Sequence, residues 1–210
     1  TLAYRVELAA AGTCRAPIVY VSASTSDVLR QRDESPGYFD TVRGGSSYFW
    51  RDATDRKTID VSQGSDFAWY MRTQNAQAPV ETRDFRTGSV VSSASLGAWD
   101  VPDQGIAVDA HFHATRALEY FRDAHGRRGL DGRGSLLRVF VHDNSSGNYF
   151  GDNATYSPRD ASIHLGDGSP ATNKYLPMAL SFDVIAHELS HGVIAHTSRL
   201  VYERESGALN

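Results

Sequence analysis

The residues with the clearest chemical potential lie close together in the run His187-Glu188-Leu189-Ser190-His191. Two histidines four positions apart lie on one face of an α-helix, so both imidazole rings can reach the same metal ion. Glu188 follows the first histidine directly and lies beside that metal, within reach of a metal-bound water. Zinc lowers the pKa of such a water to about 7, and a carboxylate can take its proton as the hydroxide attacks a carbonyl. The spacing therefore indicates metal-assisted hydrolysis, against the plainer alternative of two hydrogen-bonded core histidines beside a surface glutamate.

The third metal ligand is not fixed by this spacing. A catalytic zinc ion takes three protein ligands and keeps one position open. One extension of the motif places glycine and histidine three and six residues after the second histidine, where this chain has Ile194 and Thr197, so that pattern is excluded. His196 lies about 140° around the helix from the second histidine and faces elsewhere. Two acidic residues, Glu203 and Glu205, remain open as ligands on spacing alone.

The motif needs a helix to present it, and the sequence predicts one over 181–197, with a serine as N-cap and an acid in its first turn. A second helix is predicted over 106–124 from its apolar periodicity. It carries His111 and His113, which face different directions and are expected to be structural. Apolar and alternating runs predict strands, which lie at 4–8, 18–23, 48–50, 58–61, 89–91 and 136–142, with a short strand beginning at 28. Residues 126–134 are expected to form a glycine-rich turn and residues 143–173 a loop.

Composition excludes several classes of protein. The 210 residues carry 25 acidic and 21 basic side chains, a net charge of −4, which argues against a nucleic-acid-binding surface. No apolar run approaches the about 20 residues that span a bilayer. The single cysteine, Cys14, excludes an internal disulfide framework and a thiolate zinc cluster. An ordinary hydrophobic fraction of 40% suits a globular core of one domain or a domain with a small appendage.

Beyond the bare motif, four segments occur in an order that resembles the thermolysin-like (bacterial neutral) metallopeptidases. The run 183–193 resembles the active-site helix of that family, and 200–202 followed by 205–210 resembles its next motif. The run 108–111 resembles the preceding helix, and 153–156 the substrate-binding edge. The resemblance covers about residues 45–210 and implies an α+β, zincin-like fold with an irregular β-rich region packed on a central active-site helix.

The resemblance also assigns roles to single residues. It implies that His187 and His191 bind zinc, that Glu188 is the general base, and that Tyr202 helps to stabilise the tetrahedral transition state. In the family the third zinc ligand is the glutamate directly after the motif that ends here at Asn210. Neither of the two acidic candidates left open by spacing has support from the family. We therefore expect weak or absent zinc binding, and no activity, in the 210-residue chain by itself.

Substrate and calcium sites follow from the same resemblance. Asn153 and Ala154 match the pair that hydrogen-bonds the backbone of an extended substrate, as an added strand would. Asp183 matches one carboxylate of the family's paired calcium site, and an acid favoured by the dipole at a helix N-terminus explains it equally well. Calcium is thus expected only in the full-length enzyme.

The resemblance divides the chain into two parts. Residues 1–35 resemble the C-terminal tail of a propeptide, and residues 36–210 the N-terminal half of the catalytic domain. The parent protein is accordingly expected to be a secreted zymogen that cleaves polypeptides and is completed by a helical C-terminal domain. Two alternatives stay open: a non-catalytic binding or chaperone-like module that kept the helix, and one half of a two-chain protease.

Overall fold

The helix predicted around the histidine motif is present as α2, Phe182–His196, in the computed structural model of the chain. Ser181 is its N-cap residue, and the backbone N–H of Thr197 bonds the carbonyl of Ile194 at its end. Ile185 and Leu189 face the core with no exposed surface, which fixes the rotation of the helix. The structure describes residues 3–7, 18–22, 28–33, 39–45, 56–73, 78–94, 99, 102–168, 176–200 and 203.

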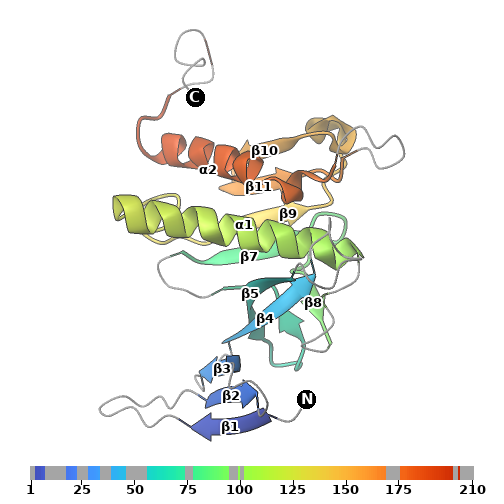
Figure 1. Ribbon diagram of the computed structural model, residues 1–210. Coiled ribbons are helices and arrows are strands. Elements are labelled where there is room, and N and C mark those ends of the chain that lie inside the picture. Colours follow the sequence, from blue (N-terminus) through green and yellow to red (C-terminus); the bar gives the residue numbers. More distant parts are fainter. Residues whose placement is uncertain are drawn as a thin grey trace.

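The longer helix α1, Pro102–His125, lies across the middle of the molecule beside α2 (Figure 1). The prediction of a helix over 106–124 is confirmed, and it is extended by one turn at its start, where proline is compatible with the first helical position. Gly126, with φ of 63°, ends the helix in the left-handed conformation that favours glycine. Small buried side chains let α1 pack closely against its neighbours; they include Ala107, Ala110, Ala114 and Ala117.

A four-stranded sheet supports both helices on one face. Its strand order is β10-β11-β9-β7, with bounds Ala154–Ser157, Ser162–Leu165, Leu137–Val141 and Val80–Asp84. The strands β11, β9 and β7 are parallel, whereas β10 runs antiparallel at the edge. In β9 every second residue is buried, as a strand covered on one face requires. α1 contacts β7 and β9, and α2 contacts β10 and β11.

One prediction about this sheet is wrong, and one of its strands has no counterpart among the predictions. Residues 143–173 were expected to form a loop, but they contain β10, β11 and the short 3-10 helix η1, Ser146–Gly151. These strands have four residues each and little alternation, so they owe their conformation to their partners rather than to local propensity. β7 was also not anticipated, because a buried Glu81 and Thr82 interrupt its apolar pattern.

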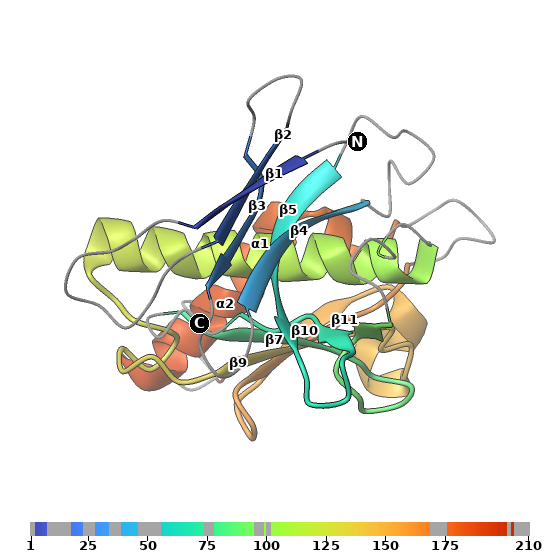
Figure 2. The same cartoon turned by 90° about the horizontal axis from the view of Figure 1, so that it is seen from below.

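The second sheet has seven strands in the order β1-β2-β3-β4-β5-β6-β8. Their bounds are Ala3–Glu7, Ile18–Ser22, Val28–Asp33, Phe39–Gly45, Arg56–Gln63, Trp69–Tyr70 and Ser92–Ser93. α1 contacts β4 and β5, which cross it in the view from below (Figure 2). The strands β1–β3 lie at the end of the molecule away from α2 (Figure 1).

The strand predictions in this region are mostly confirmed. The runs expected at 4–8, 18–23 and 58–61 correspond to β1, β2 and the centre of β5. The strand expected at 89–91 is displaced to Ser92–Ser93, and Val90 forms only an isolated bridge with Arg83. The run 48–50 lies outside the described residues. α1 thus has a sheet on each side, and the four-stranded sheet presents its edge strand β10 to α2.

Candidate active site

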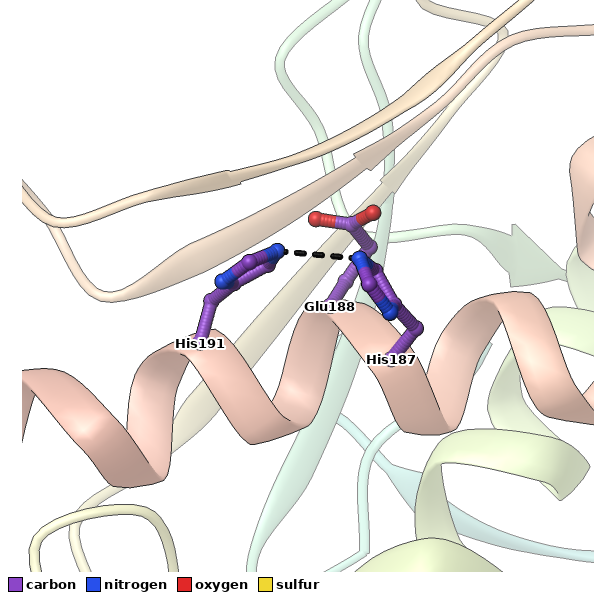
Figure 3. A group of neighbouring side chains, drawn as sticks. All are labelled: His187, Glu188 and His191. Carbon is purple, nitrogen blue, oxygen red and sulfur yellow. Dashed lines mark hydrogen bonds between the residues drawn. The ribbon is translucent and has the colours of Figure 1, made fainter. Parts of the chain in front are cut away.

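Figure 3 shows the side chains of His187, Glu188 and His191 extending from the same side of α2. The two Nε2 atoms lie 3.0 Å apart, and the ring planes are perpendicular with centroids 4.6 Å apart. Within the described part of the chain, these three residues form the group whose ligand atoms all lie within 4.8 Å of one another. The helical spacing therefore brings the three groups together as the sequence predicts.

This donor set fits a zinc ion. Two nitrogens bound to one tetrahedral zinc at about 2.0–2.1 Å are separated by about 3.3 Å. The separation of 3.0 Å observed here is close to that value, and the rings converge on a common point from adjacent turns of one helix. Imidazole nitrogen is also a preferred zinc ligand. His187 and His191 are therefore the residues that would hold the metal.

Glu188 lies deeper than the histidines, with 8% of its surface exposed. Burial raises the pKa of its carboxyl group, while the neighbouring His191 and His187 and a hydrogen bond from the backbone N–H of Tyr156 oppose that shift. The bond from Tyr156 ties the carboxylate to strand β10. Glu188 thus lies between α2 and the edge of the sheet.

An open cleft of about 600 Å³ adjoins these three residues. Strand β10 and the following turn form one wall, and α2 forms the other, so that the lining consists of Asn153, Ala154, Thr155, Tyr156, Pro158, His187, Glu188, His191, Ala195 and Leu200. A second hollow of about 500 Å³ shares four of these residues and adds Met178, Asp183 and Val184. The motif is therefore open to solvent on both sides of Glu188, as a hydrolytic site requires.

The edge strand presents backbone groups to this cleft. The carbonyl of Asn153 accepts a hydrogen bond of 3.0 Å from the N–H of Gly166, on the side where β10 pairs with β11. Successive residues of a strand direct their N–H and C=O groups to opposite sides. The backbone N–H and C=O of Ala154 consequently point away from β11. They are placed to pair with an extended chain lying in the cleft.

The remaining predicted residues are placed as follows. Asp183 is exposed in the first turn of α2, where its carboxylate accepts a hydrogen bond of 2.5 Å from the hydroxyl of Ser181. Tyr202 lies outside the described residues. Glu203 is exposed and does not belong to the group of metal-ligating atoms around the histidines. His196 bonds the carbonyl of Gly192 through Nδ1 at 2.8 Å, so it faces away as expected.

His111 and His113 serve the core, as predicted. His111 Nδ1 lies 2.8 Å from the hydroxyl of Thr82 in β7, and His113 Nδ1 lies 2.9 Å from the carbonyl of Ala179. Burial lowers the pKa of both rings, that of His111 to about 4. Both rings are therefore neutral at neutral pH and join α1 to different neighbours.

Sequence reasoning missed three residues of the site. Tyr156 holds Glu188 through its backbone, and Met178 and Val184 line the second hollow. The alternation of Ala154 and Tyr156 on one face of a strand could have revealed the first. Val184 follows from the helical position three residues before His187. No local signal marks Met178, which lies in the short 3-10 helix η2, Met178–Leu180.

An α+β fold in which one helix presents two histidines and a glutamate beside a sheet edge defines the zincin-like class. Residues 30–195 match the family described as thermolysin metallopeptidase, catalytic domain. The chain therefore belongs to the thermolysin metallopeptidase family, as the order of its motifs predicted.

Known proteins agree with this assignment. The chain is 34% identical over 191 residues to a bacillolysin of Brevibacillus brevis. The matched region covers 91% of this chain and 30% of that protein. It is 34% identical over 163 residues to a thermolysin of Bacillus sp. (strain EA1), covering 74% and 28% respectively. The chain thus spans about 30% of the length of these curated relatives.

A solved structure shares the fold. The precursor of protealysin, a metalloproteinase from Serratia proteamaculans, aligns with a TM-score of 0.53 and 22% identity, over 66% of this chain and 41% of that one. At this identity the match supports the fold alone. Among the helices of the described residues, none combines the length and apolar character that crossing a membrane demands.

Proposed function

We propose that the full-length protein is a zinc-dependent endopeptidase, and that this chain carries its zinc-binding helix, its general base and its substrate-binding strand. The observation that supports this proposal most directly is the convergence of His187, His191 and Glu188 on an open cleft. A catalytic zinc takes three protein ligands. The third ligand in this proposal comes from beyond the described residues.

The chemistry follows from the positions of these groups. A zinc ion held by His187 and His191 would polarise the peptide carbonyl and lower the pKa of a water molecule. Glu188 takes the proton from the attacking water and delivers it to the leaving amine. The backbone N–H of Tyr156 keeps the carboxylate of Glu188 in position for both transfers.

The substrate binds as an extended chain along β10. In this proposal the side chain of Asn153 and the backbone of Ala154 hydrogen-bond the peptide, which places its carbonyl over the histidine pair. Met178 and Val184 form an apolar part of the adjacent hollow. A bulky apolar side chain next to the cleaved bond would bury its surface there.

Other features are proposed from family membership. Tyr202 stabilises the tetrahedral transition state, and Asp183 is a calcium ligand in the full-length enzyme. Residues 1–35 are the end of a propeptide, so that the protein is made as a zymogen and secreted. A helical C-terminal domain, in the same or a separate polypeptide, closes the cleft and completes the zinc site.

The test is cleavage of casein by the full-length protein and its Glu188→Gln variant, which keeps the size of the side chain but removes the base. Glu119→Gln is the matched control, because Glu119 lies on α1 in an ion pair with Arg116. Cleavage by wild type and control, and its loss by at least about a hundredfold in Glu188→Gln, supports the proposal. Equal cleavage by all three proteins would refute the role of Glu188 as the base, and no cleavage by any of them would refute the proposal and favour a non-catalytic binding module.

A further inference from the structure

Asp167 joins two loops at the end of the four-stranded sheet. Its carboxylate lies 2.8 Å from His142 Nδ1 and accepts a hydrogen bond of 2.8 Å from the side-chain amide of Asn144. Its own backbone N–H donates to the side-chain oxygen of Asn144 at 3.0 Å. Burial raises the pKa of Asp167, but the bonds from His142 and Asn144 outweigh burial, and the pKa lies below its usual value. The carboxylate is thus ionised and accepts all its bonds.

His142 shows that this arrangement is imposed by the surroundings. The residue directly follows β9, is 4% exposed and has a φ of 62°, a left-handed conformation that non-glycine residues rarely adopt. Such a conformation persists where neighbouring contacts determine it. The ring of His142 bonds the carboxylate of Asp167 through Nδ1, so this bond helps to hold the turn after β9.

The backbone on either side of Asp167 reaches the cleft. The N–H of Gly166 donates to the carbonyl of Asn153 at 3.0 Å, and the N–H of Met178 donates to the carbonyl of Gly166, also at 3.0 Å. The N–H of Gly168 donates to the carbonyl of Gly151 at 2.9 Å. Segment 166–168 therefore lies between the start of the substrate strand and the apolar hollow.

Two glycines allow this close contact. A Cβ atom on Gly166 would lie 2.0 Å from the carbonyl oxygen of Gly151, which itself has a φ of 98°. The two backbones touch without intervening side chains, so a displacement of segment 166–168 passes directly to the residues before β10. Asn153 and Met178 would move with it.

The structure assigns Asp167 a positioning role: we propose that its carboxylate fixes segment 166–168 and thereby sets Asn153 and Met178 for substrate binding. The effect on substrate binding rests on the proposed function, whereas the role of Asp167 in holding segment 166–168 does not. Asp167 is not among the residues that line the cleft. It acts through the backbone, and its loss should weaken substrate binding more than the chemical step.

The experiment exchanges donors and acceptors in the full-length protein. Asp167→Asn places an amide donor opposite the amide of Asn144 and removes one hydrogen bond. Combining Asp167→Asn with Asn144→Asp restores the three bonds with the two side-chain roles reversed, because His142 can still donate to the amide oxygen. Asp131→Asn is the matched control: this carboxylate accepts bonds from Ser135 and two backbone amides of its own turn.

Two readouts separate positioning from general stability. For a peptide with an apolar residue after the cleaved bond, Asp167→Asn should raise KM about fivefold and change kcat, per active site titrated, by less than about twofold. Backbone amide exchange should become faster at Gly166 and Met178, with no change in the centre of β9. The double exchange variant should restore both values, and the control should alter neither.

Other outcomes overturn the inference. Unchanged exchange at Gly166 and Met178 refutes the geometric role, and faster exchange with unchanged KM refutes the role in binding. Failure of the double variant to restore KM also refutes the role in substrate binding. If wild-type protein cleaves no peptide, the proposed function fails and the assignment to substrate binding fails with it, whereas the exchange data still decide whether Asp167 holds the segment.

Discussion

Acidification should destabilise the protein through His111, a residue of α1 with no exposed surface. Its Nδ1 lies 2.8 Å from the buried hydroxyl of Thr82. Burial lowers the pKa of the ring from 6.5 to about 4, against opposing effects of the charge and backbone of Asp60. In the unfolded chain the same ring takes up a proton at the ordinary pKa.

The direction and the size of the change in the free energy of unfolding follow from this difference between the folded and unfolded pKa of His111. At a pH well above 6.5 the ring is neutral in both states and has no pH-dependent effect on stability. As the pH falls towards about 4, only the unfolded state binds the proton, so the free energy of unfolding decreases. At about pH 5 the loss is about 2 kcal/mol relative to about pH 7.5. His113, whose pKa is also lowered by burial, acts in the same direction.

The assay is urea unfolding of the full-length protein and a His111→Gln variant at about pH 7.5 and pH 5, with chelator present to remove bound zinc. Glutamine cannot take up a proton, and all other titrating groups are common to both proteins. The wild type should lose about 2 kcal/mol more than the variant between the two pH values. His196→Gln, which changes an exposed histidine of α2, should keep the wild-type pH dependence.

Equal pH dependence of wild type and His111→Gln would refute the reasoning. A second measurement keeps the prediction testable if the variant folds poorly. The ring protons of His111 in wild-type protein should show no NMR titration between about pH 7.5 and pH 5. A midpoint near the ordinary value would show that the buried ring takes up a proton in the folded state.

Three further outcomes are expected. In the full-length protein, replacing His191 by alanine should weaken zinc binding more than about a hundredfold, measured by a competition titration with a chromophoric chelator. The His196→Gln variant should keep the wild-type zinc affinity. Gly166→Ala should cost about 3 kcal/mol or more in urea unfolding, because its Cβ would meet backbone at 2.0 Å; Gly88→Ala, in open space at a φ of 69°, should cost only about 1 kcal/mol. Leu189→Ala should cost about 3 kcal/mol, since this side chain is fully buried. Full stability of Gly166→Ala or Leu189→Ala, or unchanged zinc affinity of the His191 variant, would contradict these expectations.

The histidine site could be predicted because its geometry is local. His187, Glu188 and His191 lie within two turns of one helix, whose periodicity and N-cap are visible in the sequence. The same holds for α1 and for β9, which have strong apolar patterns. Placement of Asn153 and Ala154 on an edge strand came only from family resemblance, because β10 has four residues and no clear alternation.

Contacts between distant segments could not be predicted in the same way. The bond between Asp167 and His142 depends on the parallel pairing of β11 with β9, which no local pattern specifies. Met178 lines the second hollow and is held there by a backbone bond to Gly166, and this too is set by tertiary structure. A strand with buried polar residues, such as β7, is difficult to predict for a related reason. Its buried Glu81 is neutralised by ion pairs with Arg72 and Arg83, and these pairs form only in the folded structure.

Neighbouring strands of the seven-stranded sheet are paired over unequal lengths, and this has a consequence for the mechanical stability of the sheet. Among the described residues, β4 and β5 are joined by seven residue pairs, whereas β3 and β4 share two, Arg32 with Asp40 and Asp33 with Phe39. Few hydrogen bonds therefore resist the separation of β3 from β4. Under tension or partial denaturation, β1–β3 should detach as one unit, leaving the helices and the cleft intact.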